Sequence, residues 1–110
     1  MEINAIEEKN VLVLRISGRL DAVTAPEYEK KVASLVKGVA RVVIDFQELE
    51  YVSSAGLRAL LMAAKPLKAA GGQMRLANVN GSIKEVFHIT GFTSIFPIDA
   101  SLADALAALS

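Results

Sequence analysis

Two adjacent serines, Ser53 and Ser54, are the residues whose type and position best suit chemistry in this sequence. They open a predicted helix, where a serine hydroxyl can accept a hydrogen bond from a first-turn amide that has no partner within the helix. Gly56 follows in the first turn, although glycine costs a helix about 1 kcal/mol relative to alanine. Without a side chain there, another molecule can approach the helix amides, and a phosphate on Ser54 would lie at the positive end of the helix dipole. The pair is therefore either two helix caps or a functional serine.

Enzymatic use of these serines has little support elsewhere in the chain. The stretch 53–56 lacks the glycine two residues before the serine that the nucleophile elbow of α/β hydrolases requires. The one candidate base, His88, stands between Phe87 and Ile89, which indicates a structural histidine at or near the surface. A small serine hydrolase built on Ser54 and His88 is therefore the weakest hypothesis.

Composition excludes several other classes of protein. The absence of cysteine excludes thiol catalysis and disulfides, and with a single histidine it excludes His/Cys zinc sites. No phosphate-binding Gly-rich loop of the P-loop type is present, and a carboxylate-only metal site has no signature. We therefore predict no enzyme activity, no catalytic residue, no cofactor and no metal. Lys plus Arg number 12 and Asp plus Glu number 12, so the net charge is zero and no basic face for nucleic acid is expected.

Length and hydropathy place the chain among small globular domains. With 110 residues, 53% of them apolar, residues 1–110 are expected to form one domain with one core. The most apolar stretch, 55–70, is interrupted by Arg58, Lys65, Pro66 and Lys68, so no membrane insertion is expected. The chain begins Met1-Glu2-Ile3-Asn4 without a secretory signal, and the expected location is the cytoplasm.

An alternating series of strands and helices must position the serine pair. Apolar, β-branched runs predict strands over 11–16, 41–45, 74–77 and 95–98, after a weaker strand around 3–6 joined through a turn near Lys9-Asn10. Helices are predicted to begin after Thr24 as a side-chain cap, at Ser53-Ser54, at 81–82 and at 99–101. Residues 19–26 and 46–52 are predicted loops. The order ββαβαβαβα indicates an α/β fold, with helices packed against a mixed, mostly parallel sheet.

The second predicted helix carries the serines at its start. Its inward stripe is predicted to comprise Leu57, Leu60, Leu61, Ala64 and Leu67. Pro66 is expected to kink or shorten the last turn, because proline lacks the backbone N–H. Met62 lies just off the stripe and suits an adaptable, partly exposed contact.

Parallel strands bring their following loops to one edge of the sheet, which is where open α/β sheets bind ligands. Asp21 should therefore lie near the serine pair, and Asp21, Glu48 and Glu50 could form an acidic rim around it. Asp45, at a strand end, is expected to bond loop amides rather than to catalyse.

The ordered set of motifs resembles a known family. Gly18-Arg19-Leu20-Asp21-Ala22, then Val43-Ile44-Asp45-Phe46 running into Tyr51-Val52-Ser53-Ser54-Ala55-Gly56-Leu57, is similar to the STAS domain of bacterial anti-sigma-factor antagonists. Later segments agree, namely 76–79, 86–92 and 95–98. The resemblance implies a small α/β domain that binds an anti-sigma factor, itself a serine kinase. The unmodified antagonist captures this kinase and frees the sigma factor; phosphorylation of one serine ends capture, and a PP2C-type phosphatase restores it.

Matching the motif places the phosphorylated serine at Ser54, with Ser53 as second choice; Ser53 stands where many family members have Asp. The partner-binding residues implied are Asp21, Glu50, Ser53, Ser54, Gly56, Arg58 and Met62. The alternative is a STAS scaffold or transporter-associated subunit without a phosphoswitch.

Overall fold

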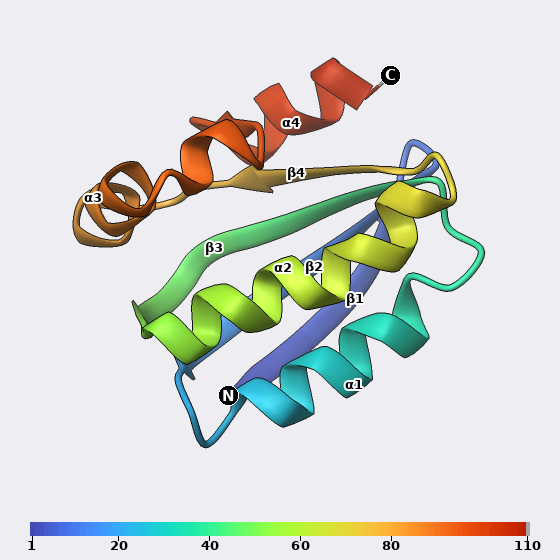
Figure 1. The fold of residues 1–110 in the computed structure, drawn as a ribbon. Helices are drawn as coiled ribbons and strands as arrows, with labels where there is room; N and C mark the ends of the chain where they lie inside the picture. Colours follow the sequence, from blue (N-terminus) through green and yellow to red (C-terminus); the bar gives the residue numbers. More distant parts are fainter. Residues whose placement is uncertain (110) are drawn as a thin grey trace.

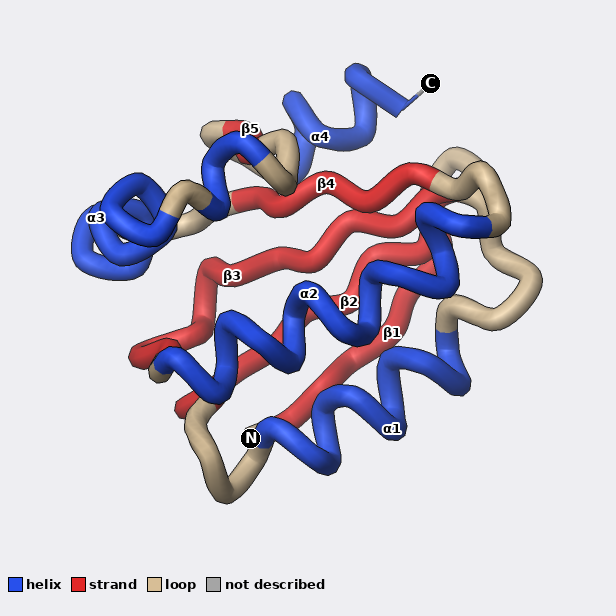
Figure 2. Tube along the Cα trace, in the orientation of Figure 1, coloured by secondary structure: helices blue, strands red, loops and turns tan. Residues whose placement is uncertain are grey.

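The computed structural model describes residues 1–109, in which five strands form one mixed sheet in the order β1-β2-β3-β4-β5. The strands are β1 (Glu2–Glu8), β2 (Val11–Leu20), β3 (Arg41–Val52), β4 (Gln73–Ala77) and β5 (Ile98–Asp99). The helices are α1 (Ala25–Leu35), α2 (Ser54–Ala69), α3 (Gly81–Thr90) and α4 (Leu102–Leu109), with a 3-10 turn at Phe92–Ser94. Figures 1 and 2 show α1 and α2 side by side on one face of the sheet and α4 on the other. The predicted α/β class and element order are confirmed.

Within residues 1–109, only the first strand pair is antiparallel. Lys9 and Asn10 have φ of 52° and 66°, as both central residues of a two-residue hairpin turn of the I′ type require. The other strands pair in parallel, through crossovers that contain the helices. Consequently β2 and β3 both end at the edge of the sheet where α2 begins (Figure 1).

Two apolar clusters lie on the two faces of the sheet. The larger, beneath α1 and α2, includes Leu14, Ile44, Phe46 and Leu60, all fully buried. The smaller lies beneath α4 and is formed by Val11, Val13, Val43, Ala77, Ala105, Leu106 and Leu109. Within residues 1–109, none of the helices is both long and apolar enough to cross a membrane.

Two central strands are longer than predicted. The expected loop 46–52 is wrong, because β3 continues to Val52, and β2 likewise includes Arg19 and Leu20. The two strands stay paired through register shifts between Arg15 and Ser17 and between Gly18 and Arg19. These bulges break the alternation of apolar and polar residues, which is the sequence signal of a strand. The last strand is shorter than predicted and begins only at Ile98.

Four details of the helices match or depart from the predictions. Thr24 precedes α1, but its side chain makes no capping hydrogen bond to the helix. Pro66 does not shorten α2, which runs on to Ala69, and Leu61 is only partly buried. At the start of α4 the Oγ of Ser101 accepts from the Asp104 amide at 3.1 Å, so the predicted cap near 99–101 is confirmed.

Candidate functional site

The serine pair lies where α2 begins, and its two hydroxyls have different roles. Ser53 has the extended backbone of an N-cap (φ −97°, ψ 176°), and its Oγ accepts a hydrogen bond from the Gly56 amide at 3.2 Å. Ser54 is the first helical residue and is exposed, and its hydroxyl has no hydrogen-bond partner within residues 1–109. One serine is therefore the helix cap, while the other presents a free hydroxyl to solvent.

Two backbone donors at the same place are also free. Gly56 donates to the cap, and Leu57 donates to the Ser53 carbonyl at 2.9 Å. The amides of Ser54 and Ala55 make no hydrogen bond in the described part of the chain. Such amides, together with the helix dipole, favour an anion at the N-terminus of a helix.

Gly56 is buried, and the role predicted for it is wrong. A Cβ there would lie 2.4 Å from the Leu20 carbonyl oxygen and 2.9 Å from Cγ2 of Val52. The same Leu20 oxygen accepts from the Ser53 amide at 2.9 Å. Glycine is therefore required for close packing of α2 on the end of β2, and not for approach by another molecule. Gly56 cannot contribute a partner contact from this buried position.

The exposed face of α2 continues away from Ser54. Arg58 and Met62 follow at helical spacing and are both exposed, Met62 by 38%. The prediction that Met62 is partly exposed is confirmed. We refer to Ser54, Arg58 and Met62 as the α2 stripe.

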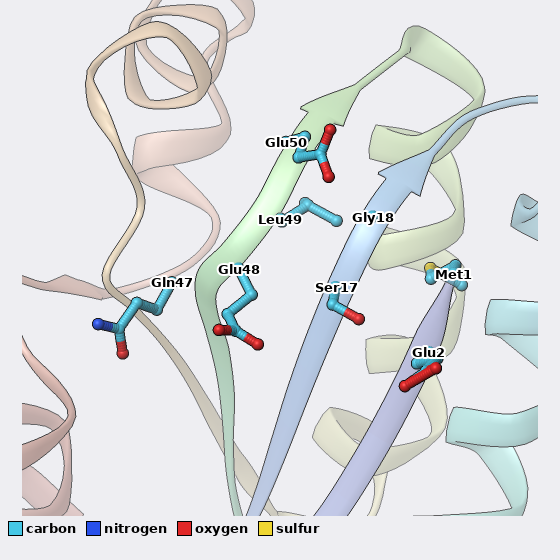
Figure 3. A pocket seen from close by; sticks show the side chains of 8 residues that line it. All are labelled: Met1, Glu2, Ser17, Gly18, Gln47, Glu48, Leu49 and Glu50. Atoms are coloured by element: carbon cyan, nitrogen blue, oxygen red, sulfur yellow. The ribbon is translucent and has the colours of Figure 1, made fainter.

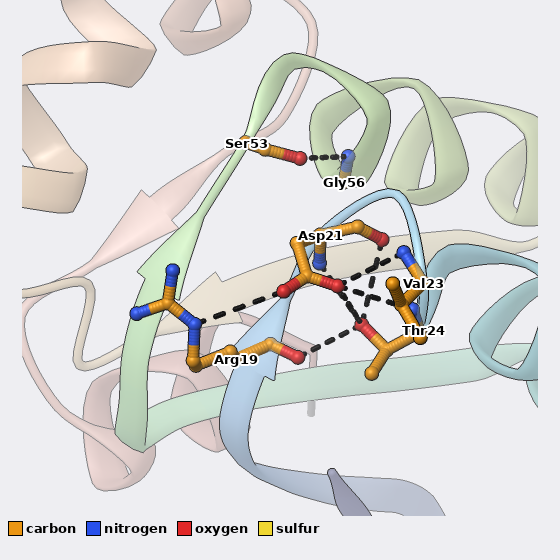
Figure 4. A network of polar contacts seen from close by, with 6 residues as sticks. All are labelled: Arg19, Asp21, Val23, Thr24, Ser53 and Gly56. Atoms are coloured by element: carbon orange, nitrogen blue, oxygen red, sulfur yellow. Dashed lines mark hydrogen bonds and ion pairs between the residues drawn. The ribbon is translucent and has the colours of Figure 1, made fainter.

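The loop between β2 and α1 is held rigid beside the start of α2 (Figure 4). Asp21 Oδ1 accepts from the amides of Val23 and Thr24, at 3.0 and 3.2 Å. Thr24 Oγ1 accepts from the Asp21 amide at 2.9 Å and donates to the Arg19 carbonyl at 2.8 Å, which explains why it does not cap α1. The Thr24 amide, foremost among these contacts, holds the pKa of the Asp21 carboxyl below its ordinary value.

This loop and the neighbouring ends of β2 and β3 expose residues that the sequence analysis missed. Val23 is 86% exposed, the highest exposure of any large apolar side chain in residues 1–109. The Arg19 guanidinium lies 4.2 Å from the centroid of the Tyr51 ring, and Tyr51 is 41% exposed. Exposed valine, arginine and tyrosine at one edge are typical of a contact surface. The sequence signal that could have identified Val23 is its position as an apolar residue between two turn-forming residues, Asp21 and Thr24.

The acidic residues do not form one rim. Glu48 and Glu50 line an open groove of about 650 Å³ with Met1, Glu2 and Ser17, across β1, β2 and β3 (Figure 3). Neither serine of the pair lines that groove. Asp21 instead lies in its own hydrogen-bonded loop, next to Arg19 Nε at 3.7 Å. The predicted ring of three carboxylates around the serines is therefore wrong.

Asp45 has the structural role predicted for it, but it lies within β3 rather than at a strand end, and the amide that it accepts from belongs to the same strand. Asp45 is fully buried, and its carboxylate accepts from the Gln47 amide at 3.0 Å, from Asn78 Nδ2 at 3.0 Å and from Arg15 Nε at 3.1 Å. His88 is at the surface, on α3, as predicted. Residues 1–109 contain no group of His, Cys, Asp and Glu that could hold a metal ion.

A hydrogen-bonded loop, a free serine at a helix start and an exposed helix face lie together at one edge of this α/β domain. The chain belongs to the STAS domain family, whose model matches residues 2–105. It is 40% identical to BtrV of Bordetella bronchiseptica over 99 residues, covering 89% of this chain and 85% of that protein. It is 27% identical to the anti-sigma-B factor antagonist of Bacillus subtilis, and the match covers 91% of this chain and 92% of that protein.

Solved structures share the fold. An anti-sigma factor antagonist from Mycobacterium paratuberculosis superposes with a TM-score of 0.87 at 29% identity, covering 97% of this chain and 92% of that one. The Bacillus cell fate determinant SpoIIAA in its phosphorylated form superposes with a TM-score of 0.74 at 20% identity, covering 99% and 100%. The Bacillus subtilis relative and the Mycobacterium paratuberculosis protein are thus both named as anti-sigma factor antagonists.

Proposed function

We propose that this protein is an anti-sigma factor antagonist whose residues 1–110 act as one STAS domain in the cytoplasm. Unmodified, it captures an anti-sigma factor that is also a serine kinase, and so releases a sigma factor. The kinase phosphorylates Ser54 and capture ends; a PP2C-type phosphatase removes the phosphate. The family and the names of its relatives support the general role, while Ser54 and the partners are the proposal.

The observation that carries the switch is the division of roles between the two serines. Ser53 Oγ is engaged by the Gly56 amide, whereas the Ser54 hydroxyl is exposed and unbonded within the described residues. Phosphorylating Ser53 would modify the oxygen that already caps the helix, and such a cap contributes about 1 kcal/mol to a helix. Phosphorylating Ser54 leaves the cap in place and adds an anion where free amides favour it. Ser54 is therefore the better acceptor.

The same geometry explains how a phosphate would stop binding without unfolding the domain. The phosphate brings about −1.5 to −2 charges to the start of the α2 stripe. A partner seated on that stripe would have to bury the net negative charge of the phosphate, which costs several kcal/mol unless the partner neutralises it. Since about 1.4 kcal/mol is a tenfold change in Kd, capture would weaken more than a hundredfold.

The proposed contact surface combines the predicted residues with exposed neighbours. It contains the partly buried Asp21 and Ser53 and the exposed Glu50, Ser54, Arg58 and Met62, and we add the exposed Val23, Arg19 and Tyr51. Gly56 supports this surface from beneath by its packing on Leu20.

The test compares Ser54→Ala with Ser54→Asp in calorimetric titrations against the purified anti-sigma factor. Ser54→Ala should keep the affinity of the unmodified protein, and Ser54→Asp should bind at least tenfold more weakly because it places a carboxylate on the stripe. Peptide mass spectrometry after incubation with kinase and ATP should find phosphate on Ser54. Equal affinities of the two variants, with no phosphoserine at 53 or 54, would instead fit a STAS scaffold without a switch.

A further inference from the structure

Arg58 is an exposed cation on α2 that no carboxylate of the described chain neutralises. Three other arginines are paired: Arg15 with Asp45, Arg19 with Asp21 and Arg75 with Asp99. Arg58 makes no hydrogen bond or ion pair within residues 1–109 through its side chain. Its guanidinium is therefore available to an anion that approaches the start of α2.

Helix geometry directs Arg58 toward Ser54. The two residues lie one turn apart on the exposed face of α2. Side chains in a helix lean toward its N-terminus, so the longer Arg58 side chain extends over the turn that carries Ser54. An anion one turn N-terminal to a cation is also the more stabilising of the two possible orders.

No neighbouring acid competes strongly for this guanidinium. Asp21 is held by its loop beside the helix start, and it already accepts from two amides and lies next to Arg19 (Figure 4). The first turn of α2 contains no acidic residue. A phosphate on Ser54 would consequently meet one free cation and two free amides from the same end of the helix.

We infer that Arg58 is the intramolecular counter-ion of phosphorylated Ser54, acting together with the amides of Ser54 and Ala55. This inference rests on the proposed function, since it concerns the modified state of the same site. It gives phosphorylation a second effect: Arg58, which is free to contact an acidic group of the partner in the unmodified protein, is withdrawn to the phosphate. One modification then adds a charge to the stripe and removes a contact from it.

The experiment uses the full chain with phosphoserine installed at position 54 during synthesis, so that its outcome does not depend on any kinase. Phosphorus NMR titration gives the second pKa of the phosphate, which is about 6 in an unconstrained phosphoserine. With Arg58 present, this pKa should lie below that value, because the cation favours the dianion. Arg58→Gln should raise it by about 0.3, the size expected for one exposed helical ion pair.

Two further variants control the test. Lys65→Gln removes an exposed cation from the far part of the same helix and should leave the phosphate pKa unchanged. Arg58→Lys keeps the charge and should restore most of the shift, and amide NMR spectra establish that each variant is folded. A phosphate pKa that is the same in the wild-type chain and in the Arg58→Gln variant would overturn the inference. Failure of the proposed function would show instead as absence of kinase-dependent phosphate on Ser54, whatever the titration gives.

Discussion

At the scale of single residues, adjacent positions of the motif perform separate tasks. Ser53 caps α2, Ser54 offers a free hydroxyl, and Gly56 lets the helix pack against the Leu20 carbonyl. The sequence favours a helix start at the serines, because serine is a good cap. It could not distinguish the two hydroxyls, since both residue types are identical and only the fold decides which one faces the Gly56 amide.

Gly56→Ala tests the packing role of this glycine. The added methyl would lie 2.4 Å from the Leu20 oxygen, so the helix start must shift, and we expect a loss of about 2 kcal/mol in the free energy of unfolding despite the better helix propensity of alanine. Gly81→Ala is the matched control, because a Cβ at Gly81 meets nothing within 4 Å. Urea denaturation measures the free energy of unfolding of both variants. A Gly56→Ala protein as stable as Gly81→Ala would refute the packing role.

At the scale of elements, the β2–α1 loop and the ends of β2 and β3 make the surface. The loop was expected near the serines because parallel strands end at one edge, and the structure confirms that placement (Figure 4). The strand extensions were missed, since Gln47, Glu48 and Glu50 are polar and exposed and the register shifts hide the alternation. Residues 46–52 form a strand because they pair with β2 in the folded protein, and the pattern of a single sequence does not contain that information.

The hydrogen bonds of the Asp21 carboxylate make the stability of the fold depend on pH. Because hydrogen bonds depress the pKa of Asp21 below 3.8 in the folded protein, its ionised form stabilises the fold at neutral pH. That contribution is fully present above the unfolded pKa and is lost as the pH falls through the lower, folded pKa. Asp21→Asn should therefore melt at a lower temperature than the wild type at pH 7, and the gap should narrow below about pH 4. Thermal melts followed by circular dichroism, from about pH 7 to about pH 2.5, measure this difference in melting temperature. A difference that stays constant with pH would show that ionised Asp21 does not stabilise the fold.

At the scale of the whole molecule, Asp45 links the parts that carry the surface. Its buried carboxylate joins β2 through Arg15, its own strand through the Gln47 amide and the segment before α3 through Asn78. The sequence indicated a structural carboxylate here from its predicted place at a strand end. Its partners could not be predicted, because Arg15 and Asn78 are far away in the chain.

Asp45→Asn should cost about 2 kcal/mol in the free energy of unfolding. The amide keeps the shape of the side chain but loses the charge, which weakens the hydrogen bonds from Arg15 and Asn78. Asp104→Asn, at an exposed position of α4, should change stability by less than about 0.5 kcal/mol. Urea denaturation of both variants tests the difference, and similar stabilities would show that the charge of Asp45 is dispensable.

The position of the Leu20 carbonyl affects how a binding partner could distinguish the unmodified protein from the phosphorylated one. The oxygen holds the Ser53 amide and lies against Gly56, so the end of β2 and the start of α2 are fixed to each other. This contact favours the same arrangement of loop and helix when Ser54 is modified. The two states of the proposed switch would then share one backbone and differ in the position of the Arg58 side chain and in their electric field, as the net charge changes from zero to about −2. A partner would then distinguish the two states by the charge at the start of α2 and not by the backbone conformation of the domain.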